Sequence, residues 1–309
     1  MARFIRPSFS APLWVARAAW VALALIPNGI APTLASHGRS AQLVFTLAAW
    51  ALWGLGTLAI FWLSPYSLSA LRMVAPLATA GLVGFLFASL STYADVALGD
   101  VAWPLIGVAI GVLALVCIFL PTFGLLHVQA SAYGDEKRLL LRVPAVQIAP
   151  IAVSYLAMVA FPLATLFALG GEVWWLTALC LVPAVLIFRV VPKRLHRFSR
   201  RWLVVVPAGV VVHDELLLAE TFMVRTTAVT HVELNATSGE ALNLTGDIAG
   251  VRRHMVLVVQ LREAEKLALS PYLAKMLGTL DALHVHSYAV APTLAGHALA
   301  ALTKPPATT

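Results

Sequence analysis

The stretch Arg189-Val-Val-Pro-Lys-Arg-Leu-His-Arg-Phe-Ser-Arg-Arg201 divides the chain into an apolar part and a tail of mixed composition. Cations beside a membrane span mark the cytoplasmic side of the bilayer. They are also attracted to anionic headgroups, at about 1 kcal/mol per residue near the surface. We therefore expect this basic segment to lie against the cytoplasmic headgroups of the lipid bilayer. Its cations are Arg189, Lys193, Arg194, Arg197, Arg200 and Arg201.

The part before the basic segment is apolar enough to cross a membrane repeatedly. The chain is 61% hydrophobic and 11% charged, whereas soluble domains average about 25% charged residues. A helix needs about 20 apolar residues to cross a bilayer and satisfies its own backbone hydrogen bonds there. We therefore expect an all-α bundle of six transmembrane helices within residues 1–192. The spans lie at about 13–35, 42–63, 73–92, 101–126, 146–169 and 173–192.

The distribution of cations orients the six spans. With the amino terminus in the cytoplasm, 13 of the 21 Lys and Arg residues flank the spans on the inside, and Arg39 alone lies outside. The positive-inside rule favours this orientation over its reverse. We expect a multi-pass protein of the inner cell membrane with both termini in the cytoplasm. The alternative is a signal peptide cleaved after Thr33-Leu34-Ala35, which leaves five spans and the same side for the tail.

The spans hold no ionisable side chain near a predicted midplane. Proton relays and ion-coupled transporters keep such groups in the membrane, so the sequence disfavours both. Arg72 lies at the edge of a predicted span, where its side chain can reach the interface. Pro27-Asn28-Gly29 introduces a break near the centre of the first span. Broken helices can form transport sites, although a packing kink is the simpler interpretation.

The loop before the fifth span contains a turn sequence, Tyr133-Gly-Asp-Glu136, followed by a short apolar strand or helix start that cations flank. One interpretation is an ordinary cytoplasmic loop that places its cations among headgroups, and another is a docking site for the tail. An enzyme site of His127, Asp135 and Glu136 is disfavoured, because the two acids pair more simply with the cations that follow them. The candidate docking residues are Tyr133, Asp135, Glu136, Lys137, Arg138 and Arg142.

Beyond residue 201 the apolar residues form short runs separated by turn signals, which is typical of β-strands. A helical pattern follows Pro292, at Leu294–Leu302. We expect a small, mainly antiparallel β domain over residues 202–303 with a closing helix, after a hinge at 193–201 and before a disordered tail at 304–309. The predicted strands are Trp202–Val206, Gly209–His213, Thr221–Arg225, Ala228–Leu234, His254–Leu261, Lys266–Leu269 and Leu283–Val290.

Three stretches resemble known groups of proteins. Trp202-Leu-Val-Val-Val-Pro-Ala-Gly-Val-Val-Val-His213 and Thr221-Phe-Met-Val-Arg-Thr-Thr-Ala-Val-Thr-His-Val-Glu-Leu234 resemble the bacterial pleckstrin-homology-like (PH-like) domains fused to membrane helices. Tyr133-Gly-Asp-Glu-Lys-Arg-Leu-Leu-Leu-Arg-Val-Pro144 is similar to uncharacterised multi-span membrane proteins of high-GC bacteria. The resemblance implies a PH-like fold for the tail and offers no activity. The first hairpin, at Pro207–Gly209, has no basic residue for a phosphoinositide headgroup, so a protein-interaction role is the better expectation.

Charge and motifs exclude several functions. The tail carries more acidic than basic residues, so the net charge of +7 belongs to the membrane edges and no nucleic-acid partner is expected. No phosphate loop or hydrolase motif occurs, and His284 with His286 is too small a set for a metal. We expect no cofactor. The sequence favours a non-enzymatic membrane protein that anchors an interaction domain and binds a protein partner or itself. The alternative is a transporter or channel for a neutral or lipidic substrate.

Overall fold

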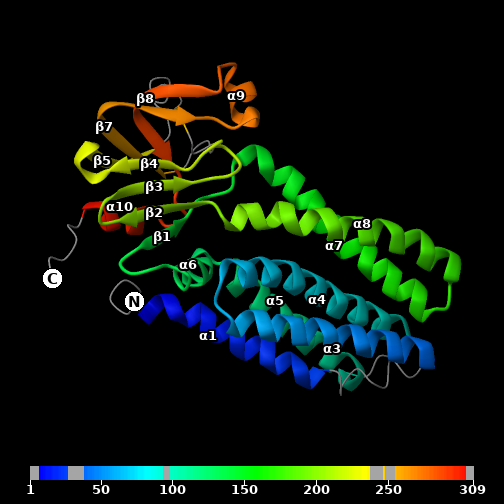
Figure 1. Ribbon diagram of the computed structural model, residues 1–309. Coiled ribbons are helices and arrows are strands. Elements are labelled where there is room, and N and C mark those ends of the chain that lie inside the picture. The colour runs from blue at the N-terminus through cyan, green and yellow to red at the C-terminus, as the bar shows by residue number, and fades with distance from the viewer. Residues whose placement is uncertain (1–6, 27–37, 93–97, 237–245, 248–254, 304–309) are drawn as a thin grey trace. The chain divides into compact units, whose positions relative to one another are not determined.

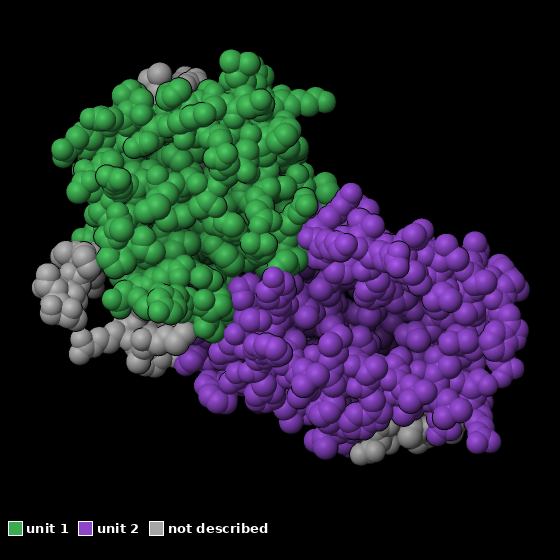
Figure 2. Space-filling view, viewed as in Figure 1, with its two compact units in different colours: residues 1, 127–150, 196–309 green, residues 2–126, 151–195 purple. Residues whose placement is uncertain are grey.

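The computed structural model describes residues 7–26, 38–92, 98–236, 246–247 and 255–303. The chain divides into two compact units, which Figure 2 colours separately. The helical unit comprises Ala2–Leu126 and Ile151–Leu195, and the sheet unit comprises His127–Pro150 and His196–Thr309. Residues 127–150 therefore belong to the sheet unit, whereas the sequence predicts them inside the transmembrane domain 1–192.

Long apolar helices dominate the first part of the chain (Figure 1). Among the described residues, five helices are long and apolar enough to cross a membrane, which confirms a mostly helical membrane part. They are α3 (Arg39–Phe61), α4 (Pro65–Thr92), α5 (Leu98–Phe119), α7 (Ala145–Gly170) and α8 (Trp174–Ser199). A short helix, α6 (Pro121–Gln129), follows α5.

The first apolar segment forms a shorter element. Helix α1 (Pro7–Ala22) continues into a 3-10 turn, η1 (Leu23–Leu25). The second half of the predicted span 13–35 lies outside the described residues, as does the predicted helix break Pro27-Asn28-Gly29. A sixth span therefore stays a prediction.

Helix α4 begins eight residues before the predicted span at 73–92. Ser64 and Ser67 cap its first turn reciprocally, because each backbone N–H donates to the other's hydroxyl at 3.0 Å. Pro65 occupies the first helical position, where its missing N–H costs nothing. The early start places Arg72 inside the helix rather than at its edge.

The helical unit buries one face of its helices and exposes large apolar side chains on the other. Trp20 is 1% exposed and packs its ring against Gly56, where a Cβ atom would overlap the indole. Leu47 and Leu58, by contrast, are 69% and 72% exposed. An apolar outer surface of this kind suits contact with lipid rather than water.

The sheet unit contains two four-stranded sheets. The first is antiparallel throughout and has the order β1-β2-β3-β4. The second has the order β5-β7-β8-β6, with only the short β6 parallel to its neighbour. The strands are β1 (Lys137–Leu140), β2 (Trp202–Val206), β3 (Gly209–His213), β4 (Phe222–Arg225), β5 (Val229–Ala236), β6 (Gly246–Asp247), β7 (Met255–Ala268) and β8 (Ala282–Val290).

The core of the sheet unit joins its two sheets. Phe222 of β4 and Tyr288 of β8 meet edge to face with ring centroids 5.2 Å apart. Helix α10 (Ala295–Thr303) packs on β5 and β7 and closes the unit. The prediction of a mainly antiparallel β domain with a closing helix is confirmed.

Two features of the sheet unit differ from the prediction. Strand β7 is continuous where two strands separated at residues 262–265 were expected, because its charged middle lies at a register shift against β8 and faces solvent. Helix α9 (Pro271–Leu277) was not expected, although Ser270 caps it and Gly278 ends it at φ +64°. A 3-10 turn, η2 (Thr226–Ala228), links β4 to β5.

Candidate functional site

The loop before α7 supplies the first strand of the first sheet. Lys137 to Leu140 pair antiparallel with Val205 to Trp202, and Leu141 N–H donates to the Arg201 carbonyl at 3.0 Å. Leu139 and Leu140 are buried. The candidate docking loop is thus a structural part of the tail domain, paired over a long separation in sequence.

The same loop also contacts the chain beyond β8. Arg142 N–H donates to the Ala291 carbonyl, and Thr293 N–H donates to the Leu140 carbonyl, both at 2.8 Å. The Thr293 hydroxyl donates to the same carbonyl at 3.1 Å. The segment after β1 therefore binds the start of β2 on one side and the segment leading to α10 on the other.

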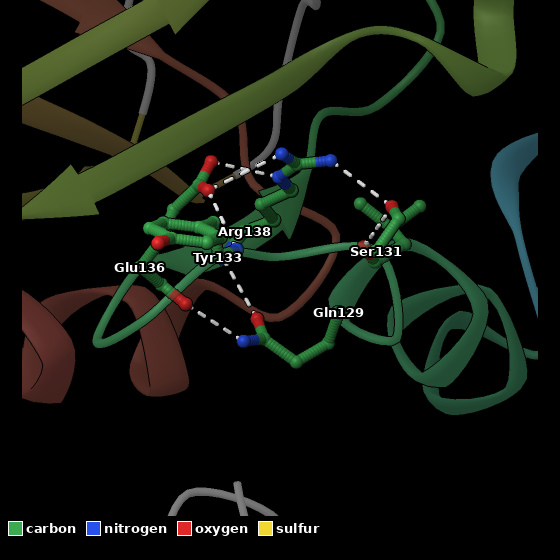
Figure 3. Close-up of polar contacts among 6 residues, drawn as sticks. Gln129, Ser131, Tyr133, Glu136 and Arg138 are labelled. Atoms are coloured by element: carbon green, nitrogen blue, oxygen red, sulfur yellow. Dashed lines mark hydrogen bonds and ion pairs between the residues drawn. The ribbon is translucent and has the colours of Figure 1, made fainter.

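Figure 3 shows how polar side chains hold the turn before β1. Gln129 of α6 donates to the Glu136 carbonyl at 2.7 Å and accepts from Arg138 N–H at 2.8 Å. Glu136 accepts from Tyr133 N–H, and Gly134 takes φ +56°, which favours glycine. The turn is thus fixed from both sides and leaves the Tyr133 side chain 90% exposed at its tip.

Arg138 links this turn to β2 and β3. It pairs with both carboxylate oxygens of Glu136, at 2.7 and 3.2 Å, and lies 5.2 Å from the Trp202 ring centroid. The hydrogen bond from Arg138 holds the pKa of Glu136 below its usual value. Trp202 stacks in turn on His213, whose pKa is lowered mainly by burial. The carboxylate therefore stays ionised and the imidazole neutral at pH 7.

The cations of the basic segment differ in exposure: some lie at the surface and one is buried. Helix α8 runs through the predicted hinge as far as Ser199, and Arg200 pairs with Glu215 at 2.9 Å. Arg201 is 1% exposed, so the expectation that it faces headgroups is wrong. The cations that remain exposed are Arg189, Lys193, Arg194 and Arg197.

Arg201 belongs to a buried polar junction. Its Nε and Nη2 donate to one carboxylate oxygen of Asp214 at 2.9 and 2.6 Å. The other oxygen accepts from the backbone N–H groups of Leu216 and Leu217, and Arg201 also donates to the Arg142 carbonyl. Arg201 therefore links the start of β2 to the turn after β3 through an ion pair, and to the segment after β1 through a hydrogen bond.

The helical unit contains an apolar cavity of about 90 Å³. Trp20 and Trp53 border it and donate their indole N–H groups to each other's backbone carbonyls, at 3.0 and 3.1 Å. The indole donors are thus satisfied without a ligand, and the space between them suits hydrocarbon. Other residues around the cavity are Phe45, Trp50, Gly81, Phe85 and Phe167.

The three residues considered for an enzyme site do not share one accessible surface. His127 is completely buried in α6, whereas Asp135 is exposed at the turn and Glu136 is engaged by Arg138. Within the described ranges, no group of three or more His, Cys, Asp or Glu side chains could hold a metal ion. His284 and His286 are both exposed on β8.

Comparison with known proteins adds no assignment. No family model matches the chain, and neither a curated protein nor a solved structure matches it. The resemblance to PH-like domains therefore stays an expectation drawn from the sequence, and function is argued from geometry.

Proposed function

We propose that this protein is a non-enzymatic protein of the bacterial inner membrane that anchors a cytoplasmic interaction domain. In this proposal six helices cross the membrane, both termini lie in the cytoplasm and the sheet unit is a PH-like domain. The five long apolar helices and the excess of cations on one set of loops support it.

One observation carries the proposal: the sheet unit is built from two separate parts of the chain. The chain passes between the units after Leu126, after Pro150 and after Leu195. Strand β1, between two helices of the membrane part, completes the sheet that the tail begins. Three connections thus hold this unit to the helices, which suits a domain anchored at a membrane rather than one on a single flexible tether.

The surface of the sheet unit supports an interaction role. Tyr133 extends from a turn that is fixed by Gln129 and Glu136, so little conformational entropy is lost when a partner covers it. Tyrosine is enriched among residues that dominate protein interfaces. Strand β4 is an edge of the first sheet and exposes Met223. A partner protein or a second copy could bind this surface through Tyr133 or along the edge strand.

The full-length protein in mild detergent tests this proposal. Affinity capture with quantitative mass spectrometry should recover a reproducible partner, or light scattering should show self-association. Tyr133→Ala should reduce that association by about tenfold, as loss of an interface anchor does. Tyr272→Ala, on the exposed part of α9, is the control. A monomer that captures nothing, or equal effects of both substitutions, contradicts the proposal.

A carrier for a neutral or lipidic substrate is the second candidate, because the helical unit holds the 90 Å³ apolar cavity. Gly81→Leu fills part of it, since a Cβ atom there meets only Leu163 at 3.8 Å. Gly54→Leu is the matched control, because nothing lies within 4 Å of a Cβ atom there and Gly54 does not border the cavity. Movement of fluorescent lipid in proteoliposomes should slow only with Gly81→Leu. No movement with the unmodified protein rejects this candidate.

A further inference from the structure

Arg72 lies two turns inside α4. It follows Pro65 by seven residues, or about 10 Å along the helix axis at 1.5 Å per residue. Its guanidinium carbon is 5.7 Å from the ring centroid of Phe119 at the end of α5, and Phe119 packs edge to face on Tyr155 of α7 at 6.0 Å. A ring of α5 therefore contacts this cation of α4, and a ring of α7 packs on that ring.

Among the residues that the structure describes, no acidic side chain neutralises Arg72. None of the ion pairs among the described residues includes it, and its buried Nε has no hydrogen-bond partner there. Asp100 lies in the first turn of α5, roughly 28 Å along the axis from Phe119, and Glu172 accepts from Ser40 beyond the far end of α7. An unpaired cation in apolar surroundings is costly, and such groups mark functional sites in membrane proteins.

An apolar groove lies beside this cation, because Phe119, whose ring the guanidinium contacts, also lines the groove. It is lined by Pro76, Leu115, Val116, Phe119 and Tyr155. Pro76 follows Arg72 by four residues, so both lie on the same face of α4. Val116 is 55% exposed, which shows that the groove opens to the outer surface of the helical unit. Hydrocarbon-like walls thus lie next to the cation that contacts Phe119.

We propose that Arg72 and this groove bind one anionic phospholipid from the surrounding bilayer. The guanidinium pairs with the lipid phosphate, which its planar fork of N–H donors matches. An acyl chain lies along Pro76, Leu115 and Val116. A phospholipid satisfies both the cation and the apolar walls beside it, whereas a free inorganic anion leaves those walls uncovered. The site is separate from the Trp-lined cavity and does not depend on the function proposed above.

Native mass spectrometry of the full-length protein, titrated with phosphatidylglycerol, tests the role of Arg72 in lipid binding. Arg72→Gln should weaken retention of the first lipid by about tenfold or more, the loss expected when a charged hydrogen-bonding partner is removed. Arg72→Lys should keep part of the affinity. Arg189→Gln, which removes an exposed cation from α8, is the control for general attraction to anionic lipid and should change retention less than twofold. Equal losses in Arg72→Gln and Arg189→Gln overturn the proposal.

The groove and the lipid are tested separately. Val116→Trp should block the groove and weaken binding about tenfold even where Arg72→Gln does not survive purification. Val112→Trp, an exposed site one turn away that does not line the groove, should have little effect. Phosphatidylcholine should bind more weakly than phosphatidylglycerol, and inorganic phosphate should not raise the melting temperature. Equal binding of both lipids, stabilisation by phosphate alone, or no effect of Val116→Trp rejects the site.

Discussion

Each unit contains an arginine away from solvent, and the two arginines have opposite electrostatic environments. In the sheet unit, Asp214 neutralises Arg201 and backbone groups complete the junction. In the helical unit, Arg72 contacts an aromatic ring, and no carboxylate among the described residues pairs with it. A self-satisfied ion pair serves the fold, whereas an unneutralised cation leaves room for an anion from outside. The comparison separates structural charge from charge available to a ligand.

The largest effect should come from breaking the neutralised pair. Asp214→Asn leaves Arg201 as an uncompensated buried charge, which costs about 3–5 kcal/mol of stability. Thermal unfolding of the full-length protein and hydrogen exchange in β2 and β3 should both register this loss. Glu215→Gln is the matched control, because its half-exposed pair with Arg200 is worth at most about 1 kcal/mol. Equal effects of the two substitutions would show that burial does not determine how much stability is lost when an ion pair is broken.

A second test compares apolar contacts of the two units. Leu139→Ala removes a side chain that is 2% exposed and should destabilise the sheet unit by about 2–4 kcal/mol. Leu47→Ala, at a side chain 69% exposed on α3, should cost less than about 0.5 kcal/mol. Hydrogen exchange should increase in β2 only with Leu139→Ala. Unchanged hydrogen exchange in β2 would mean that β1 does not stabilise the first sheet.

Arg72 provides the third test. Arg72→Leu should leave stability in lipid-free detergent unchanged or raise it by about 1–2 kcal/mol, because it removes a charge that no carboxylate among the described residues pairs with. Arg201→Leu should destabilise strongly, since it leaves Asp214 buried without its partner. Melting temperatures measured side by side check the contrast. A large loss in Arg72→Leu would assign this arginine a structural role.

The smallest effect is a pH dependence at the loop. Because the folded pKa of Glu136 lies below its ordinary value of 4.5, ionised Glu136 stabilises the fold above that pH. The contribution, about 0.5–1 kcal/mol for this partly exposed pair, is lost as pH falls through the lowered pKa. Glu136→Gln should therefore lower the melting temperature at pH 7 and match the unmodified protein at low pH. If the melting temperatures of the two proteins still differ at low pH, ionisation of Glu136 is not the cause of the difference.

The sequence predicts the elements that depend on local pattern. Long uncharged runs are sufficient for α3 and α7 and for α8 as far as the basic segment, and short β-branched runs between turns are sufficient for β2 and β3. The start of α4 was missed because its capping signal, Ser64-Pro-Tyr-Ser67, lies outside the apolar run. A search for reciprocal caps would have found it and would have placed Arg72 inside the helix.

Long-range pairing explains the remaining differences. The apolar run at 139–141 indicates either a short strand or a helix start, and the partner that decides for a strand, β2, lies beyond two long helices. The basic segment reads as one surface feature, yet only Arg201 meets a carboxylate within the core. Composition counts charges but does not show which of them another part of the chain buries. The groove at Arg72 likewise depends on three helices that meet in space.

Strand β1 also fixes an order of events during synthesis. Its partner β2 follows two further helices, so the first sheet stays incomplete until α7 and α8 have left the ribosome. At about 5–20 residues per second, the stretch between Leu140 and Trp202 takes roughly 3–12 s to make. Through that interval two leucines destined for the core have no partner strand. A chain that stops before residue 202 lacks β2, so these two leucines stay without a partner strand. The unpaired apolar strand then distinguishes an incomplete chain from a complete one.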